Sequence, residues 1–360
     1  MDKILVVSNP NQMSGVDYHR MVIPHANLQD FDVHFINEID SIGDTDLFPQ
    51  CELTFKDFAL IVFSRTVSRF NKVDLVLAKL KRLKIPFVVD FDDWWELPHY
   101  HILFDHYKQN DLPYQMVQCM KAATAITCTH EVLADKILLY NKKVCILPNA
   151  IDDTQAQFTT LKHPSDRIRI GWSGSETHYR DLLPLYDNFV SLYQDNKIKD
   201  NIKVLAAGYR NTSSIWQEYN IIFSAGKRAT REQFENITAE DANTYARAYE
   251  HFDIALCPLH ADEFNSCKSN LKILEAGFKG VPVIASDVYP YSSILNHRVN
   301  AMAVKKPKRQ FYEYIKELVL DEGMRTELAQ SNYQFCKQNY HISKVTPRRS
   351  FMYKKIINGI

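Results

Sequence analysis

The sequence predicts an α/β protein built from two doubly wound domains. Its 360 residues are enough for two domains that each bury a core of their own. Short apolar runs of strand length alternate with stretches of helical periodicity along the whole chain. This alternation is typical of parallel sheets that carry helices on both faces.

The first half of the chain contains a series of strand-like runs separated by helical segments. Helices are expected from about Tyr18, over residues 72–83 and after residue 130. The expected strands occupy residues 3–8, 32–37, 59–65, 86–92, 122–130 and 143–149. Residues 149–166 are polar and contain a proline, so we expect them to link the two domains.

The second half repeats this pattern. Strands are expected within residues 167–175, 202–208, 220–223, 253–259, 281–287 and 301–306. Residues 311–339 and 347–360 have the pattern of helices. We therefore expect an N-terminal domain over 1–160, a C-terminal domain over 161–335, and a last helix within 336–360 that returns to the N-terminal domain.

Composition excludes several classes of protein. The 43 basic and 43 acidic residues balance, so no strong overall field for nucleic acid or membranes is expected. No apolar run approaches the roughly 20 residues that span a bilayer, and the start of the chain lacks the features of a signal peptide. Seven scattered cysteines without a CxxC pair favour a reducing compartment. We expect a cytoplasmic protein, with basic runs at 305–309 and 347–355 that allow peripheral contact with an anionic surface.

Small residues follow the first strand of the second half. Ligands of open parallel sheets bind beyond the carboxyl ends of the strands, and Ser173, Gly174 and Ser175 would let backbone N–H groups approach a phosphate closely. His178 either donates to the same anion or caps the next helix. The alternative is that glycine and serine only serve the turn.

A charged stripe is expected on the helix that starts near residue 269. Lys268 and Lys272 are one turn apart, Ser269 can cap the helix, and Glu275 could accept hydrogen bonds from the two hydroxyls of a ribose. The alternative is a solvated Lys/Glu face. Gly280, followed by an apolar strand, instead favours a helix inside a parallel sheet.

The N-terminal half offers a second set of candidates. Asp90, Asp92 and Asp93 end a strand beside Trp94 and Trp95. Carboxylates bind hydroxyls, and indole rings offer a stacking face to a sugar or base; capping and core packing are the alternatives.

The loop after the first strand carries Gly15, which would permit close backbone approach to a ligand, while His19 and Arg20 fit an ordinary surface position. His99, His101 and His106 match no strong metal-ligand spacing, so no metal site is expected.

The segments at 146–152, 169–182 and above all 252–291 resemble the retaining, nucleotide-sugar-dependent glycosyltransferases of the GT-B fold, especially family 4 (glycosyl transferases group 1). The resemblance implies two Rossmann-like domains facing across a cleft. It also implies that the C-terminal domain holds the donor, with residues 173–178 on the diphosphate and Glu275 on the ribose. The remaining donor-binding candidates are Ser269, Asn270 and Leu271. The family's second glutamate is Cys267 here, and Glu263 is a candidate replacement.

The resemblance implies transfer of a hexosyl or related sugar to a hydroxyl with retention of anomeric configuration. A UDP-sugar is the expected donor, and no obligatory cofactor or metal is expected. Lys268 and Lys272 would stabilise the leaving diphosphate, while Asp92 and Asp93 would orient the acceptor. The acceptor stays open between a glycan, a lipid-linked glycan, a protein and a modified DNA base. A nucleotide-sugar epimerase and a catalytically degenerate nucleotide-sugar-binding protein are the alternatives.

Overall fold

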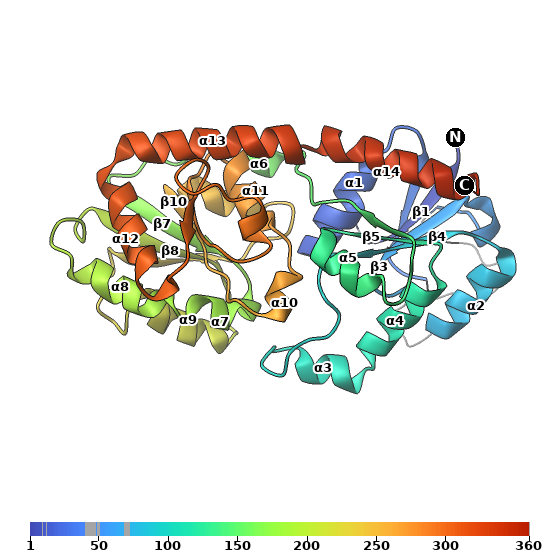
Figure 1. The fold of residues 1–360 in the computed structure, drawn as a ribbon, viewed down its shortest axis with the longest axis horizontal. Helices are drawn as coiled ribbons and strands as arrows, with labels where there is room; N and C mark the ends of the chain where they lie inside the picture. Colours follow the sequence, from blue (N-terminus) through green and yellow to red (C-terminus); the bar gives the residue numbers. More distant parts are fainter. Residues whose placement is uncertain (9, 12, 40–47, 49–50, 68–72, 360) are drawn as a thin grey trace. The chain divides into compact units, whose positions relative to one another are not determined.

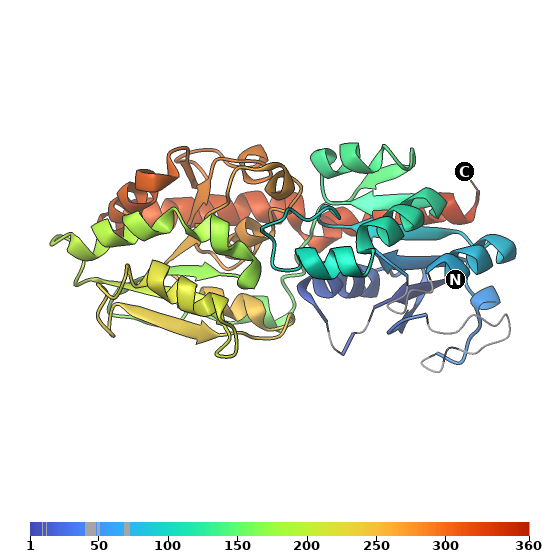
Figure 2. The same ribbon diagram turned by 90° about the horizontal axis from the view of Figure 1, so that it is seen from below.

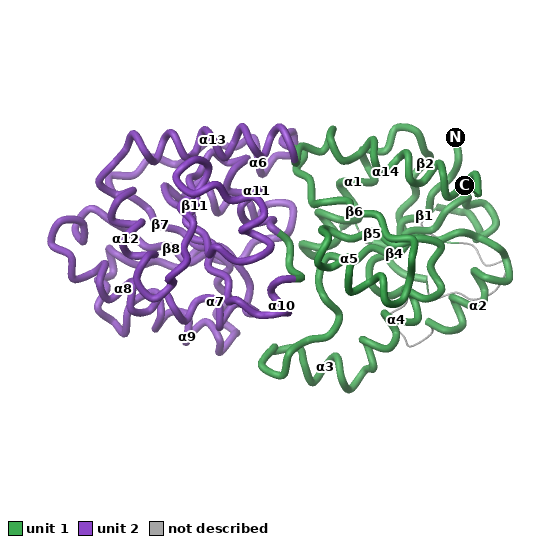
Figure 3. The backbone as a smooth tube through the Cα atoms, in the orientation of Figure 1, with its two compact units in different colours: residues 1–152, 267–269, 340–360 green, residues 153–266, 270–339 purple. Residues whose placement is uncertain are grey.

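The computed structural model describes residues 1–8, 10, 11, 13–39, 48, 51–67 and 73–359 (Figures 1 and 2). Gln12, Lys72 and Ile360, which belong to segments discussed above, lie outside the described residues. The chain separates into two compact units (Figure 3). Unit 1 comprises Met1–Asp152, Cys267–Ser269 and Tyr340–Ile360, and unit 2 comprises Asp153–Ser266 and Asn270–Asn339. The units thus change at residues 152 and 339, where the sequence suggested boundaries at 160 and 335.

Unit 1 is built on a parallel sheet that has six strands within the described residues, in the order β2-β1-β3-β4-β5-β6. The strands are β1 (Lys3–Val7), β2 (Asp32–Ile36), β3 (Leu60–Ser64), β4 (Phe87–Phe91), β5 (Ala125–Cys128) and β6 (Val144–Ile146). The winding direction reverses between β1 and β3, which makes the carboxyl ends of these strands the expected ligand position.

Helices cover both faces of this sheet, so its strands are apolar on both sides. The side chain of Leu5 belongs to one core, and those of Ile4 and Val6 belong to the other. This explains why β1 is a continuous apolar run. One face carries α2 (Val73–Leu83), α4 (Leu112–Ala122) and α5 (Glu131–Ile137), and the other carries η1 (Asp17–Val22), α1 (Ile23–Ala26) and α14 (Ile342–Ile357). The short elements η2 (Phe55–Asp57) and α3 (Phe104–Gln109) complete the unit.

The last helix of the chain, α14, is part of the unit 1 core. Tyr353 is fully buried, and its hydroxyl lies 2.8 Å from His25 Nε2. His25 Nδ1 lies 2.5 Å from the Met21 carbonyl oxygen. A carbonyl can only accept, so Nδ1 carries the proton of the neutral ring and Nε2 accepts from Tyr353. Ser350 Oγ also donates to Asp30 Oδ2 at 2.5 Å.

Unit 2 has a second parallel sheet of six strands within the described residues, in the order β12-β11-β10-β7-β8-β9. The strands are β7 (Ile168–Ser173), β8 (Ile202–Tyr209), β9 (Phe234–Thr238), β10 (Ile254–Cys257), β11 (Val283–Ser286) and β12 (Met302–Val304). The winding reverses between β7 and β10, and this is the strand order of a Rossmann fold.

Helices also lie on both sides of the second sheet, with α8 and α9 on one side and α13 on the other (Figure 1). The α12 helix packs with α8 and contributes Phe311 and Ile315 to the same core. The elements are α6 (Ala156–Thr159), η3 (Glu176–His178), α7 (Tyr179–Leu182), α8 (Leu185–Gln194), α9 (Ile215–Phe223), η4 (Tyr245–His251), α10 (Glu263–Ser266), α11 (Leu271–Phe278), η5 (Tyr291–Ser293), α12 (Pro307–Leu320) and α13 (Glu322–Tyr340).

One expected strand of unit 2 is wrong. Residues 220–223 form the end of helix α9, where Ile222 and Phe223 pack into the core with Trp216 and Tyr219 at helical spacing. A run of four residues is too short to separate a buried helix from a strand by its pattern. The edge strand is β9 instead, whose mixed sequence, FENIT, is less apolar than that of the central strands.

Burial of His25 makes the stability of unit 1 depend on pH. Burial, reinforced by the nearby Arg349 cation, lowers the pKa of His25 to about 3, whereas an unfolded histidine titrates near 6.5. Between these values the unfolded chain binds a proton that the native state does not. Stability therefore falls as the pH decreases through this range, by about 1.4 kcal/mol per pH unit for one full proton.

A His25→Gln variant should lose stability less steeply than the wild type between pH 6.5 and 4.5. Denaturant unfolding at a series of pH values measures this slope. Parallel curves for the two proteins would contradict the assignment.

Candidate functional site

The carboxyl ends of β7 and β10 are neighbours at the winding reversal of unit 2. The loop after β7 begins at Gly174, and the loop after β10 leads through α10 to α11. Both loops carry the residues that the sequence singled out for a donor. Because such reversals leave a crevice beyond the strand ends, this is the natural ligand position of the unit.

Lys272 connects α11 to the loop after β7. Its Nζ donates to the Ser173 carbonyl oxygen at 2.5 Å and lies 5.6 Å from the centre of the Trp172 ring. A methyl group added at Gly174 would lie 3.0 Å from the same Nζ. An ammonium group thus stands directly beside a loop that the sequence predicted to bind phosphate.

Two glycines allow the loop after β7 to take this path. A Cβ at Gly174 would lie 2.5 Å from the Trp172 ring, and a Cβ at Gly208 would lie 2.1 Å from the Gly174 carbonyl oxygen. Gly208 also has a φ of +106°, which L-residues rarely adopt. Beyond the glycines, Tyr219 accepts a hydrogen bond from the His178 N–H at 3.0 Å and donates to the Ser175 carbonyl at 3.3 Å.

Asp181 joins the two loops. Its Oδ1 accepts from the His260 N–H at 2.8 Å and from Asn265 Nδ2 at 2.9 Å, while its Oδ2 accepts from His178 Nδ1 at 2.7 Å. The carboxylate is buried. The His178 ring therefore faces Asp181, and it does not cap α7. Asp181 was not among the candidates that the sequence indicated.

Glu275 is fully buried, so it is not part of a solvated face. Its Oε2 accepts from the hydroxyls of Tyr245 at 2.9 Å and Tyr249 at 3.2 Å. Burial, together with the Glu275 carboxylate, raises the pKa of the Tyr245 hydroxyl, and the Ser173 hydroxyl acts on it in the opposite direction. The two tyrosines stay protonated and orient the carboxylate. Sequence reasoning missed both, because they lie in η4, 30 and 26 residues before Glu275 in the sequence.

The expected charged stripe on α11 is only partly present. The helix starts at Leu271, so Lys268 and Ser269 precede it and belong to unit 1. The N-cap is Asn270, which makes no capping side-chain hydrogen bond within the described residues, and Ser269 is not the cap. The ammonium group of Lys279 donates hydrogen bonds to the carbonyl oxygens of Gln157 and Thr160, both at 3.0 Å.

The position of the missing family glutamate is apolar. Cys267 is fully buried within the hydrophobic cluster of unit 1. Glu263, the candidate replacement, is exposed at the start of α10, where its carbonyl accepts from Ser266 Oγ at 2.7 Å.

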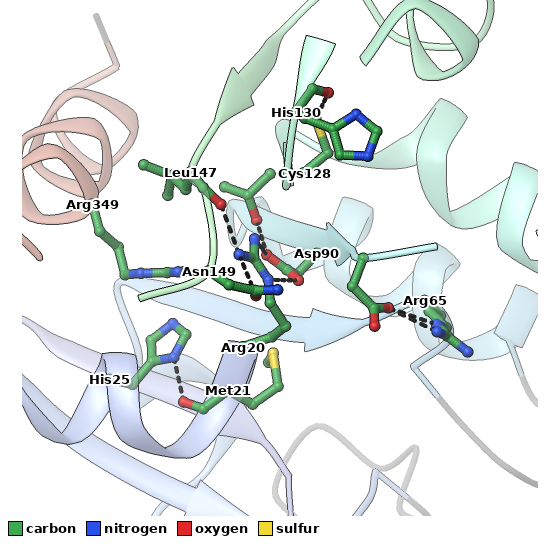
Figure 4. A network of polar contacts seen from close by, with 12 residues as sticks. Arg20, Met21, His25, Arg65, Asp90, Cys128, His130, Leu147, Asn149 and Arg349 are labelled. Atoms are coloured by element: carbon green, nitrogen blue, oxygen red, sulfur yellow. Dashed lines mark hydrogen bonds and ion pairs between the residues drawn. The ribbon is translucent and has the colours of Figure 1, made fainter. Parts of the chain in front are cut away.

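In unit 1, Asp90 has a different environment from Asp92 and Asp93, the two aspartates that follow it. Asp90 is fully buried and forms a double contact with Arg20, at 2.9 and 2.7 Å (Figure 4). Arg20 also donates to the Leu147 carbonyl at 2.7 Å, and Thr127 donates to Asp90 at 2.5 Å. Burial alone would raise the pKa of Asp90, but the Arg20 cation holds it below its usual value. The surface position expected for His19 and Arg20 is wrong, since both are buried.

Asp92 and Asp93 remain partly exposed and share Arg65 as a partner. Arg65 donates to Asp92 Oδ1 from Nε at 3.1 Å and from Nη2 at 2.7 Å, whereas its closest approach to Asp93 is 3.4 Å. Burial and the Asp92 charge raise the pKa of Asp93, and the Lys268 and Arg65 cations oppose this effect. Asp93 therefore takes up a proton more readily than an ordinary aspartate.

The Lys268 cation acts to lower the pKa of both Asp93 and His101. Its backbone carbonyl lies 2.8 Å from Nε2 of His130, whose Nδ1 accepts from the Leu133 N–H and caps α5. The structure thus places Lys268 with the aspartates of unit 1 and Lys272 with the glycine loop of unit 2.

The other candidates are scattered. Gly15 is exposed, with open space where a Cβ would stand. Trp95 is buried in the core, and Trp94 is half-buried beneath Lys136. Within the residues that the structure describes, no group of three or more His, Cys, Asp or Glu could hold a metal ion. In the same part of the chain, no helix has both the length and the apolar character to cross a bilayer.

Solved structures share this fold. A glycosyltransferase from Rickettsia africae superimposes with a TM-score of 0.67 at 12% identity, over 100% of this chain and 99% of that one. HepE from Anabaena in complex with UDP gives 0.64 at 11% identity, over 99% and 100%. A sucrose-phosphate synthase from Thermosynechococcus elongatus gives 0.64 at 13% identity, over 100% of both chains. No curated protein sequence matches the chain.

Two Rossmann-like domains of this kind define the GT-B class of enzymes. The model of the family described as glycosyl transferases group 1 matches residues 154–335, just over half of the chain. The chain belongs to this family and is a glycosyltransferase.

Removing the Asp181 carboxylate should destabilise unit 2. Asp181→Ala would leave the His260 N–H, the Asn265 amide and the His178 ring without their acceptor, at a cost of about 2–4 kcal/mol in the free energy of unfolding. Asp187→Asn, at an exposed position of α8, is the control and should behave like the wild type. Equal unfolding midpoints for Asp181→Ala and the control would contradict the role of Asp181.

Proposed function

We propose that the enzyme transfers a sugar from a nucleotide-diphosphate sugar to a hydroxyl acceptor with retention of anomeric configuration. The observation that carries this proposal is the Lys272 ammonium at the glycine loop of unit 2, 2.5 Å from the Ser173 carbonyl. A cation beside close-packed backbone suits a phosphate group. HepE, which shares the fold, has been solved with UDP and with UDP-glucose, and this supports a UDP-sugar as donor.

Each candidate of unit 2 has a distinct role in the proposal. Lys272 and the backbone of Ser173, Gly174 and Ser175 would bind the diphosphate, and Asn270 and Leu271 would add the first turn of α11. Glu275, oriented by Tyr245 and Tyr249, would accept hydrogen bonds from ribose hydroxyls. Its burial suits this role, because a carboxylate held by fixed donors does not need to reorganise when the ligand binds.

The chemistry depends on the charge that develops as the sugar leaves. The bond between the anomeric carbon and the diphosphate breaks, and negative charge collects on the departing phosphate oxygen. Lys272 would stabilise this charge, and the acceptor proton would pass to that oxygen. Asp92 and Asp93 of unit 1 would hold the acceptor hydroxyl, with Lys268 balancing their charge and Gly15 leaving room for the backbone to approach the substrate.

Loss of the Lys272 charge should slow transfer to every acceptor. Lys272→Ala should lower kcat by about 100-fold or more, as expected when a group that stabilises developing charge is removed, and Lys272→Arg should retain part of the activity. UDP release from UDP-glucose, with related UDP-sugars in parallel, measures this. Lys305→Ala, on an exposed side chain of unit 2, is the control. A Lys272→Ala enzyme that worked at the wild-type rate would refute the phosphate assignment.

Replacement of Asp92 should instead depend on the acceptor. Asp92→Asn should lower kcat/KM for a hydroxyl acceptor by about tenfold, which corresponds to one charge-assisted hydrogen bond, and should leave donor hydrolysis by water nearly unchanged. Asp135→Asn, on the exposed side of α5, is the control. An equal loss with water and with all acceptors would contradict an acceptor role.

NMR of the product distinguishes retention from inversion at the anomeric carbon.

A further inference from the structure

A groove of about 420 Å³ lies on unit 1. It is formed by the segment after β4 together with α3 and the start of α4. Its aromatic lining consists of Phe104, Tyr107 and Tyr114, and its charged lining consists of Glu96, Lys108 and Asp111. The volume falls within the range of ordinary small-molecule sites.

One aromatic ring of this groove is left open to solvent. None of the residues of α3 is fully buried, but its Tyr107 packs against the hydrophobic cluster of unit 1 and its Phe104 ring lies 4.5 Å from the ring of His99. Tyr114, on α4, is instead 60% exposed. A surface helix normally turns its large apolar side chains toward the interior, so the Tyr114 ring that remains exposed at the groove is available to a ligand.

Tyr107 connects the groove to the proposed acceptor position. Its hydroxyl accepts a hydrogen bond from Arg65 Nη1 at 3.3 Å. The same guanidinium donates to Asp92 Oδ1 at 2.7 Å. Arg65 thus links Tyr107, which lines the groove, to the Asp92 carboxylate by hydrogen bonds.

We propose that this groove binds a second sugar unit of an oligosaccharide acceptor whose reactive hydroxyl lies at Asp92 and Asp93. This inference rests on the proposed function and specifies its acceptor. The faces of Tyr107 and Tyr114 pack against the apolar C–H face of a sugar ring. The carboxylates of Glu96 and Asp111 accept hydrogen bonds from its hydroxyls, and Lys108 donates to its oxygens.

The charges of the groove favour a carbohydrate over a polyanion. Two carboxylates face one ammonium group, which disfavours the phosphates of DNA and of anionic lipid headgroups. Exposed Ile102 and Leu103 precede α3 but do not line the groove. A lipid surface would contact Ile102 and Leu103, so the test distinguishes membrane binding from carbohydrate binding.

The test compares short and long acceptors in the full-length enzyme. Saturation-transfer NMR with maltotriose, cellotriose and chitotriose, and with glucose and N-acetylglucosamine, selects the acceptor probe. Tyr114→Ala should raise the KM for the selected trisaccharide about tenfold through loss of ring contact, with the KM for the monosaccharide unchanged. Phe351→Ala, on α14, is the matched control because its side chain is 62% exposed. Tyr107→Phe, which removes only the hydroxyl facing Arg65, should retain trisaccharide binding.

Two results would overturn the proposal: the absence of saturation transfer from all three trisaccharides, or an unchanged trisaccharide KM in Tyr114→Ala. Loss of binding to phosphatidylglycerol vesicles in Tyr114→Ala, with unchanged trisaccharide binding, would also overturn it and assign the surface to a membrane. A wild-type enzyme that releases no nucleoside diphosphate from any nucleotide-diphosphate sugar would refute the proposed function. The groove would still be tested in that case, because the NMR measurement needs no turnover.

Discussion

The arrangement of unit 2 depends on one buried carboxylate. Asp181 accepts hydrogen bonds from the loop after β10, through His260 and Asn265, and from His178 in the loop after β7. Hydrogen bonds to an ionised acceptor are strong where water is excluded. The two loops on either side of the winding reversal are thus fixed to each other before any ligand arrives, and Lys272 meets the Ser173 carbonyl in a preformed geometry.

In unit 1, a buried ion pair fixes distant segments of the chain to each other. Arg20 of η1 contacts Asp90 at the end of β4 and the Leu147 carbonyl after β6. A buried pair costs desolvation, so its net contribution to stability is small, but it penalises any packing that separates the partners. Asp90 therefore has a structural role. Asp92 and Asp93 remain as the carboxylates that are proposed to hold the acceptor.

The sequence predicted the two parallel sheets, because alternating strands and helices each have a local pattern of apolar residues. The resemblance to glycosyltransferases placed residues 173–178 and Lys272 at one diphosphate; in the structure the Lys272 Nζ contacts the Ser173 carbonyl, and their binding of a diphosphate stays a prediction. The sequence could not predict that Glu275 is buried, because its partners Tyr245 and Tyr249 come from a distant turn of chain. The burial of Arg20 was hidden for the same reason: its partner Asp90 follows 70 residues later. Contacts between distant segments leave no periodic signal.

Helix α14 completes the hydrophobic core on one face of the first sheet. Tyr353 packs in the same cluster as Ile4, Val6 and Val88, so the core on this face of the first sheet is complete only after helix α14 has been synthesised. The second unit, apart from residues 267–269, is one continuous stretch of chain and can finish folding earlier. During synthesis, unit 1 therefore completes its core only after unit 2 has been made, and the apolar side chains that α14 covers stay exposed to misassembly until then.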